Sequence, residues 1–222
     1  KSLLFYVNQF DSIINELEDL ENQKFKLKSQ LKDFEEEFQN KMKITETKLK
    51  GCLILEPQFF EDNRGIFFEV FKKKELCDFL GYEVDFVQEN KSISKKGVLR
   101  GLHFQTGTAA QAKLVSVQKG EVDDVIVDIR PDSESFGKYI KINLSDINNK
   151  SIFIPKGMAH GFVALSNNVI FTYLCDNYYN PSMESGILYN DADLAIDWGY
   201  SGKELTVSEK DLILPSFKEL LK

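Results

Sequence analysis

The chain has 222 residues, of which 42% are hydrophobic, and its formal net charge is −7. This length accommodates one sizeable domain with an appendage, and the hydrophobic fraction is sufficient for a packed core. The acidic balance argues against nucleic acid or an anionic membrane as the main partner. No apolar run approaches the roughly 18 residues that a membrane helix needs. We therefore expect a globular protein with neither nucleic-acid nor membrane partners.

The three cysteines, Cys52, Cys77 and Cys175, form no Cys-x-x-Cys pair, and their number is odd. Such a set is typical of reduced thiols rather than of a disulfide framework. No signal peptide is visible in the sequence. These features together predict a cytoplasmic protein.

Residues 1–44 contain no glycine and no proline, and their apolar residues recur at alternating intervals of three and four. This spacing is the heptad repeat of a coiled coil, whose a and d positions form an apolar seam. The a positions are Leu3, Phe10, Leu17, Lys24, Leu31 and Phe38, and the d positions are Tyr6, Ile13, Leu20, Leu27, Phe34 and Lys41. We interpret the segment as a long two-stranded coiled-coil helix. The alternatives are an amphipathic helix folded back on its own domain and a linker from a missing upstream domain.

From residue 45 onward, short apolar runs alternate with segments rich in Gly, Asn, Asp or Pro. This rhythm indicates many short strands, as in an all-β sandwich or jelly roll. A short helix is expected over residues 72–81, ended by Gly81, and the last ten residues are a second candidate for a short helix. No regular alternation of strands and helices appears, and there is no Gly-rich phosphate loop. We expect two domains, a coiled-coil helix over 1–44 and a mainly β domain over 45–222.

The stretch GVLRGLHFQ, residues 97–105, carries His103, one of only two histidines. It has the composition of a strand, and strict alternation of side chains would put Arg100 and His103 on opposite faces. If His103 points into a barrel, its imidazole is a suitable base near neutral pH. The plainer alternative is a core histidine satisfied by a hydrogen bond.

The second histidine, His160, lies in IPKGMAHGF, and the two stretches together resemble the two sequence motifs of the cupins. In metal-binding cupins the first motif contains His-x-His, whereas here Gln105 stands where the second histidine would be. Two histidines without a third ligand do not favour a transition-metal site. We therefore expect no metal and no cofactor.

Several other polar residues suggest proton chemistry on an anionic substrate. Lys113 lies in an apolar run and is a candidate electrophile, although a lysine there often reaches the surface instead. The candidate phosphate contacts are Arg64, Arg100 and Lys210, and the candidate acids or stacking residues are Tyr173, Tyr178 and Tyr179. The alternatives are ordinary surface charges and core aromatic residues. Composition and spacing alone lead to a β-barrel with an acid/base pocket.

Several motifs follow one another in order between about Thr47 and Pro215. They include LEPQFFEDNRGIFFE, FVQENKSISKKGVLRGLHFQ, QAKLVSVQKGEVDDVIVDIR, IPKGMAHGF, YYNPSMESGILYNDADLAIDW and SEKD. Together they closely resemble the dTDP-4-dehydrorhamnose 3,5-epimerase family of cupin-type sugar-nucleotide epimerases. The resemblance implies a cupin jelly-roll β-barrel that forms a homodimer. It also implies inversion of carbons 3 and 5 of a dTDP-4-keto-6-deoxy sugar through an enolate, in dTDP-rhamnose-type biosynthesis.

The resemblance further assigns roles to individual residues. His103 resembles the base, Asp211 the carboxylate that orients it, Tyr173 the acid on the opposite face, and Lys113 the group that stabilises the enolate oxygen. The positions that match sugar-nucleotide contacts are Arg64, Glu69, Gln88, Glu89, Asn90, Arg100, His160, Tyr179, Glu184 and Lys210.

Two other functions remain open from the sequence. The first is a related epimerase that inverts only one carbon or accepts a different nucleotide sugar. The second is a non-catalytic cupin that serves as an oligomerisation or sugar-binding module, although the joint presence of His103, Lys113 and Tyr173 argues against it. Homodimerisation is expected through both the barrel and the coiled coil.

Activity should survive chelation by EDTA and dialysis, because Gln105 occupies the position at which a cupin metal site needs a ligand. The measurement is the epimerisation rate before and after treatment. Loss of activity that a divalent ion restores would contradict this expectation.

Overall fold

The computed structural model describes residues 2–39, 41–200 and 205–221; the side chains of residues 2–9, 11–13, 34–39 and 221 lie outside that description. The chain divides into two compact units, Lys1–Lys41 and Met42–Lys222. In the described part of the chain, no helix is long and apolar enough to cross a membrane.

The first unit is a single helix, α1 (Ser2–Gln39). Every described side chain in it, from Phe10 and from residues 14–33, is exposed. The heptad residues whose side chains lie outside the description are Leu3, Tyr6, Ile13, Phe34 and Phe38. The pairing of α1 with another helix stays a prediction.

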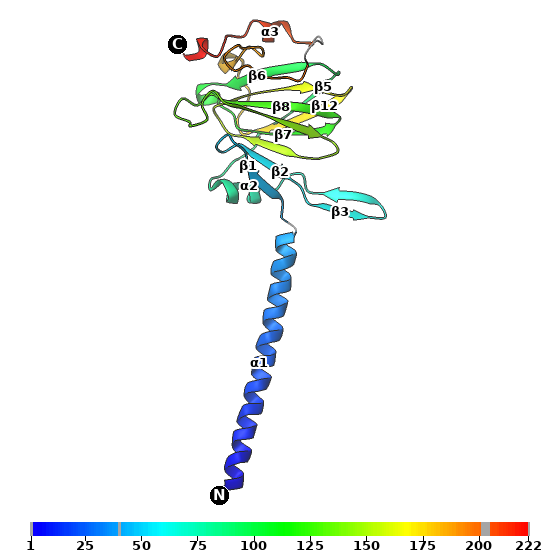
Figure 1. Cartoon of the computed structure of the whole chain (residues 1–222), viewed down its shortest axis with the longest axis vertical. Coiled ribbons are helices and arrows are strands. Elements are labelled where there is room, and N and C mark those ends of the chain that lie inside the picture. Colours follow the sequence, from blue (N-terminus) through cyan, green and yellow to red (C-terminus); the bar gives the residue numbers. More distant parts are fainter. Residues whose placement is uncertain (1, 40, 201–204, 222) are drawn as a thin grey trace. The chain divides into compact units, whose positions relative to one another are not determined.

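The second unit is mainly β, as the sequence predicts, and consists chiefly of two antiparallel sheets (Figure 1). The six-stranded sheet contains, in spatial order, β1 (Lys43–Glu46), β2 (Leu53–Glu56), β10 (Ser151–Ile154), β7 (Lys113–Lys119), β12 (Val169–Cys175) and β5 (Gln88–Ser94). The five-stranded sheet contains β13 (Glu184–Gly186), β6 (Leu99–Gln105), β11 (Met158–Ala164), β8 (Glu121–Asp128) and β9 (Tyr139–Ser145). A separate hairpin consists of β3 (Phe59–Asp62) and β4 (Gly65–Phe68).

The inner faces of the two sheets meet in one apolar core. Val115 and Val117 of β7 and Phe171 of β12 belong to the same buried cluster as Ile126 of β8 and Phe162 of β11. Because successive side chains of a strand point to opposite faces, residues two positions from these core members also point inward. This rule directs several of the polar side chains discussed below into the space between the sheets.

The outer faces of both sheets are also covered. Against the six-stranded sheet packs α2 (Lys73–Leu80), which ends as predicted at Gly81 in the left-handed conformation (φ 75°). On the five-stranded sheet, Leu99 and Leu102 pack against Ile187, Trp198 and other residues of the C-terminal segment. That segment contains α3 (Glu209–Leu212) and the short 3₁₀ helix Glu219–Leu221. The remaining 3₁₀ helices are Gly107–Ala109 and Pro181–Met183.

Strands β6 and β11 approach each other unusually closely at Gly101 and Gly161. A Cβ atom added to Gly101 would lie 2.6 Å from the Cα of Gly161, and one added to Gly161 would lie 2.7 Å from the backbone oxygen of Arg100. His103 pairs with His160 and Arg100 pairs with Phe162, so β6 has one residue more than β11 between these pairs. This β-bulge moves the side chains beyond it to the other face of the strand.

The prediction that strict alternation puts Arg100 and His103 on opposite faces of β6 is therefore wrong. Arg100 and His103 are three residues apart, but both line the same cavity. The sequence pattern alone did not reveal the bulge, although Gly101 is the kind of residue that a bulge accommodates.

Gly161→Ala should lower the free energy of unfolding by about 1–3 kcal/mol or more, because the added methyl group meets backbone atoms that have little room to move. Gly161 does not have a positive φ, so the effect reports steric contact rather than backbone strain. The measurement is urea-induced unfolding at equilibrium. An unchanged unfolding midpoint would contradict the close approach of the two strands.

Candidate active site

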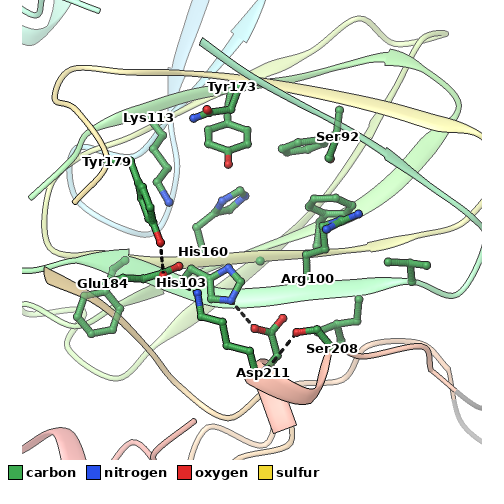
Figure 2. A pocket seen from close by; sticks show the side chains of 18 of the residues that line it. Ser92, Arg100, His103, Lys113, His160, Tyr173, Tyr179, Glu184, Ser208 and Asp211 are labelled. Carbon is green, nitrogen blue, oxygen red and sulfur yellow. Dashed lines mark hydrogen bonds and ion pairs between the residues drawn. The ribbon is translucent and has the colours of Figure 1, made fainter. Parts of the chain in front are cut away.

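A cavity of about 720 Å³ lies between the two sheets and holds most of the polar residues singled out in the sequence. Figure 2 shows side chains from several strands pointing into it. The six-stranded sheet contributes residues from β5, β7 and β12, and the five-stranded sheet contributes residues from β6 and β11. The cavity is thus lined by groups from both inner faces.

His103, on β6, is held by Asp211 of α3. Its Nε2 atom lies 2.7 Å from Asp211 Oδ1, and Asp211 Oδ2 accepts a hydrogen bond from the backbone N–H of Gly101 at 3.3 Å. Asp211 is 3% exposed, and its own N–H donates to Oγ of the N-cap residue Ser208. With Nε2–H donating to the carboxylate, Nδ1 carries the lone pair that can accept a proton.

The surroundings keep His103 in the neutral form that a base requires. Burial of the imidazole lowers the pKa of His103 below its ordinary value of 6.5, and the Lys113 ammonium acts in the same direction. The hydrogen bond and charge of Asp211 act in the opposite direction and raise the pKa. Burial has the larger effect, so the ring is neutral at pH 7.

Tyr173 and Lys113 reach the cavity from the six-stranded sheet, opposite His103. Both point inward because they lie two residues from the core members Phe171 and Val115. The Lys113 Nζ atom lies 5.8 Å from the centroid of the Tyr173 ring. Burial raises the pKa of Tyr173 and lowers the pKa of Lys113. The phenol therefore stays protonated near pH 7, as a proton donor must.

A second His–Asp pair lies deeper in the barrel, between His160 of β11 and Asp124 of β8. His160 Nε2 lies 2.7 Å from Asp124 Oδ1, and the carboxylate is fully buried. Burial raises the pKa of Asp124, and His160 and Lys113 act against that rise. Among the described residues, Asp124 Oδ2 has no hydrogen-bond partner.

The sequence reasoning missed Asp124. The signal that could have found it is the run VDDVIVD, in which Asp124 falls between the inward-facing Val122 and Ile126. A carboxylate on the apolar face of a strand is rare unless it is paired.

At the edge of the cavity, Glu184 joins two of the predicted substrate contacts. Its Oε2 atom accepts a hydrogen bond from the Tyr179 hydroxyl at 2.6 Å and pairs with the Lys210 ammonium. Burial raises the pKa of Glu184, but Lys210 and Tyr179 outweigh it, so the pKa falls and the carboxylate is ionised near pH 7. Arg100, also in the lining, donates from Nε to Ser94 Oγ at 3.1 Å.

Strand β5 presents only alternate residues to the cavity. Gln88 and Asn90, which are hydrogen-bonded to each other at 3.0 Å, line it together with Ser92. Glu89 lies between them on the exposed face of the strand and is not part of the lining. Ser92 was missed by the sequence reasoning, and its buried Oγ atom has no hydrogen-bond partner among the described residues. Its regular spacing from Gln88 and Asn90 is the signal that could have identified it.

Two predicted substrate contacts, Arg64 and Glu69, also lie outside the cavity lining. Arg64 is in the turn of the β3–β4 hairpin, where its Nη2 atom lies 2.5 Å from Asp62 Oδ2. Glu69 directly follows β4 and pairs with Lys72. Tyr178, considered as an acid or stacking residue, is 67% exposed and does not line the cavity either.

The expected absence of a metal site stays a prediction. Gln105 accepts a hydrogen bond through Oε1 from the backbone N–H of Asn180 at 3.0 Å. Within residues 2–39, 41–200 and 205–221, no three His, Cys, Asp or Glu side chains form a group that could hold a metal ion.

Taken together, the cavity contains a neutral imidazole on one sheet and a protonated phenol and the Lys113 amino group on the other. Such a set can remove a proton from one face of a bound molecule and return one to the opposite face. In its protonated form, Lys113 can stabilise negative charge that develops between them.

Comparison with known proteins gives a consistent result. The sequence profile of the dTDP-4-dehydrorhamnose 3,5-epimerase family matches residues 46–219. The enzyme of that name from Escherichia coli (strain K12) is 48% identical over 181 residues, which cover 82% of this chain and 97% of that protein.

Solved structures of the same family are similar as well. The enzyme from Elizabethkingia anophelis is 48% identical with a TM-score of 0.78, and the match covers 80% of this chain and 97% of that one. The Legionella pneumophila enzyme, in complex with dTDP-4-keto-L-rhamnose, is 44% identical with a TM-score of 0.76, and the match covers 80% and 94%. From its sequence and its fold, the chain belongs to the dTDP-4-dehydrorhamnose 3,5-epimerase family.

Proposed function

We propose that this chain inverts carbons 3 and 5 of a dTDP-4-keto-6-deoxyglucose, in the biosynthesis of dTDP-rhamnose or a similar deoxysugar. The observation that carries the proposal is the placement of His103 and Tyr173 on opposite sheets of one cavity. Inversion at carbon requires a base on one face of the sugar and an acid on the other. The two inner faces of the barrel supply these positions.

The first step in the proposal is proton abstraction by His103. Nδ1 of the neutral imidazole takes the proton from a carbon next to the carbon-4 carbonyl, and the C–H electron pair moves to form the enolate. Asp211 stabilises the resulting imidazolium through its hydrogen bond to Nε2. The Lys113 ammonium stabilises the enolate oxygen, since such a proton becomes acidic only when the developing charge is stabilised.

The second step returns a proton from the opposite face. The Tyr173 hydroxyl donates its proton to the same carbon, the enolate collapses to the ketone, and the configuration is inverted. The phenolate then recovers a proton from solvent and the imidazolium loses one, so the site returns to its starting state. The proposal assigns both carbons to this one base and this one acid.

Binding of the nucleotide is proposed to involve the charged groups at the edge of the cavity, chiefly Arg100 and Lys210. Cationic side chains are suited to diphosphate groups. His160, Gln88, Asn90, Tyr179 and Glu184 also line the cavity, which supports their assignment to substrate binding. Arg64, Glu69 and Glu89 lack this support within one chain.

We also propose that the second unit forms a homodimer. The β3–β4 hairpin that carries Arg64 exposes several large apolar side chains, namely Phe59, Phe60, Ile66 and Phe67. An exposed apolar cluster of this kind favours contact with another protein surface. A reducing, cytoplasmic compartment is supported by the three cysteines, which are free and buried.

Solvent exchange can separate the roles of the proposed base and acid. His103→Ala should lose proton abstraction, so neither carbon 3 nor carbon 5 of the keto sugar should take up deuterium from deuterated water. We expect a loss of about 10²- to 10⁴-fold. Tyr173→Phe should still form the enolate and regain a proton from the His103 side, which gives deuterium uptake with little inverted product. The readouts are NMR and mass spectrometry of the recovered sugar.

The exposed Tyr178 provides a matched control, because Tyr178→Phe makes the same chemical change outside the cavity and should behave as the native enzyme. Exchange at the native rate in His103→Ala would show that another group is the base. Uptake at one carbon only in the native enzyme would favour the single-carbon epimerase.

The pH profile tests the role of Asp211. In the native enzyme, kcat/KM should fall on acidification as His103 becomes protonated, with a midpoint below 6.5 because burial lowers its pKa. Asp211 raises that pKa, so Asp211→Asn should move the acidic limb to still lower pH. The rate near pH 7 should fall by less than the about 10²- to 10⁴-fold cost of removing the base. If the acidic limb of Asp211→Asn stays at the native pH or moves to higher pH, Asp211 is not the carboxylate that supports His103.

A further inference from the structure

We propose that α1 pairs in an antiparallel orientation with α1 of a second copy of this chain. In this arrangement Leu17 faces Leu27 of the second copy, and Lys24 faces its Leu20. The proposal is independent of the epimerase site and concerns a segment outside the family match, which covers residues 46–219.

The first observation is the exposed apolar seam. Each large apolar side chain described at an a or d position is more than half exposed; these are Phe10, Leu17, Leu20, Leu27 and Leu31. Side chains at such positions are repeated every 3.5 residues on average, which matches the seam of a coiled coil. A helix with this pattern is stabilised chiefly by burying the seam against a partner.

The second observation is that the charges of α1 are grouped by sign, in an acidic, a basic and a second acidic segment, the last being residues 33–37. Residues 16–21 contain Glu16, Glu18, Asp19 and Glu21 and no basic residue, whereas residues 24–32 contain Lys24, Lys26, Lys28 and Lys32 and no acidic residue. Lys24 and Lys28 are four residues apart, a spacing at which like charges destabilise a helix. A partner that brings carboxylates to this segment would remove that penalty.

A parallel pair in register would instead bring residues of like charge together. It places Lys24 against Lys24 of the second copy, because both occupy the same a position. It also brings Glu16, at a g position, beside Glu21 of the second copy, at the following e position. Every one of these contacts joins like charges, and each occurs within the apolar seam or beside it.

The antiparallel pair matches opposite charges. The acidic segment of each helix runs beside the basic segment of the other, and Glu21 and Lys28, both at e positions, become neighbours across the interface. Lys24 then faces Leu20 and has Glu21 of the second copy within reach of its long side chain. In this register each a position from residue 10 to residue 38 is aligned with a d position of the second copy.

The orientation has a geometric consequence. α1 has 38 residues, so it is about 57 Å long at 1.5 Å per residue. In the antiparallel pair, the C-terminal ends of the two helices, from which residues 42–222 continue, lie at opposite ends of the pair.

Disulfide crosslinking of the full chain tests the orientation. Leu17→Cys chains and Leu27→Cys chains, one of them carrying an affinity tag, are mixed and oxidised. The antiparallel pair predicts a mixed Leu17→Cys/Leu27→Cys dimer, because these positions face each other. It predicts little linkage in either variant alone, since identical positions are then about 15 Å apart along the helix and a disulfide needs Cα atoms within about 7 Å.

Two controls define the background. Ser29→Cys places a thiol on the outer face of the same helix, and the native chain reports linkage by its own buried cysteines. Crosslinking of Leu17→Cys to itself as the main product would overturn the proposal in favour of a parallel pair. A mixed product no more abundant than the Ser29→Cys background would show that α1 does not pair with a second copy.

Charge reversal gives an independent test by sedimentation equilibrium of the full chain. Glu21→Lys and Lys28→Glu should each weaken α1-dependent association by about 2- to 30-fold, because the pair of helices contains two Glu21–Lys28 contacts, each worth about 1.4- to 5-fold as an exposed ion pair. The double variant should recover most of the loss. Leu17→Asp/Leu31→Asp supplies the unpaired reference, and unchanged epimerase activity shows that residues 42–222 remain folded. Stronger association of Glu21→Lys, or no recovery in the double variant, would overturn the antiparallel arrangement.

Discussion

The close contact between β6 and β11 at Gly101 and Gly161 is the constraint on which the site depends. Neither position has room for a Cβ atom, so the two backbones approach to a distance that other residues would prevent. The bulge that accompanies this contact shifts the register of β6 by one residue between Arg100 and His103. As a result, a cationic side chain and an imidazole that strict alternation would separate both project into one cavity.

Burial between the two sheets then sets the protonation states. Each ionisable group in the cavity has lost part of its hydration, which disfavours the charged form. Burial lowers the pKa of His103 and raises the pKa of Tyr173, so that both remain neutral near pH 7. One pKa unit corresponds to about 1.4 kcal/mol, so modest changes in burial decide whether the imidazole can accept a proton. Asp211 partly offsets the lowering of the His103 pKa, and its hydrogen bond to Nε2 leaves Nδ1 facing the cavity.

The two units of the chain differ in how far they bury their apolar side chains. In residues 42–222, the cores on both faces of each sheet bury many apolar side chains within one chain, whereas those of the β3–β4 hairpin remain exposed. In α1 the apolar a and d side chains that the structure describes are exposed, and an acidic segment, residues 16–21, precedes a basic one, residues 24–32. The described part of the first unit thus leaves its apolar seam exposed, and the second unit is built around a cavity.

The sequence by itself determined the features that depend on local periodicity. Heptad spacing predicted a helix over the first segment, alternating runs predicted a mainly β unit, and Gly81 marked the end of α2. Alternation places Lys113 and Tyr173 on the same strand faces as Val115 and Phe171, and the structure shows that these faces point inward. The family resemblance supplied the roles expected of these residues.

Only the tertiary structure decided what depends on contacts between distant segments. It set the bulge in β6, the pairing of Asp124 with His160 and the contact of Asp211 with a histidine 108 residues away. It also decided that the face of β5 carrying Gln88 and Asn90 lines the cavity, which leaves Glu89, on the other face, outside it.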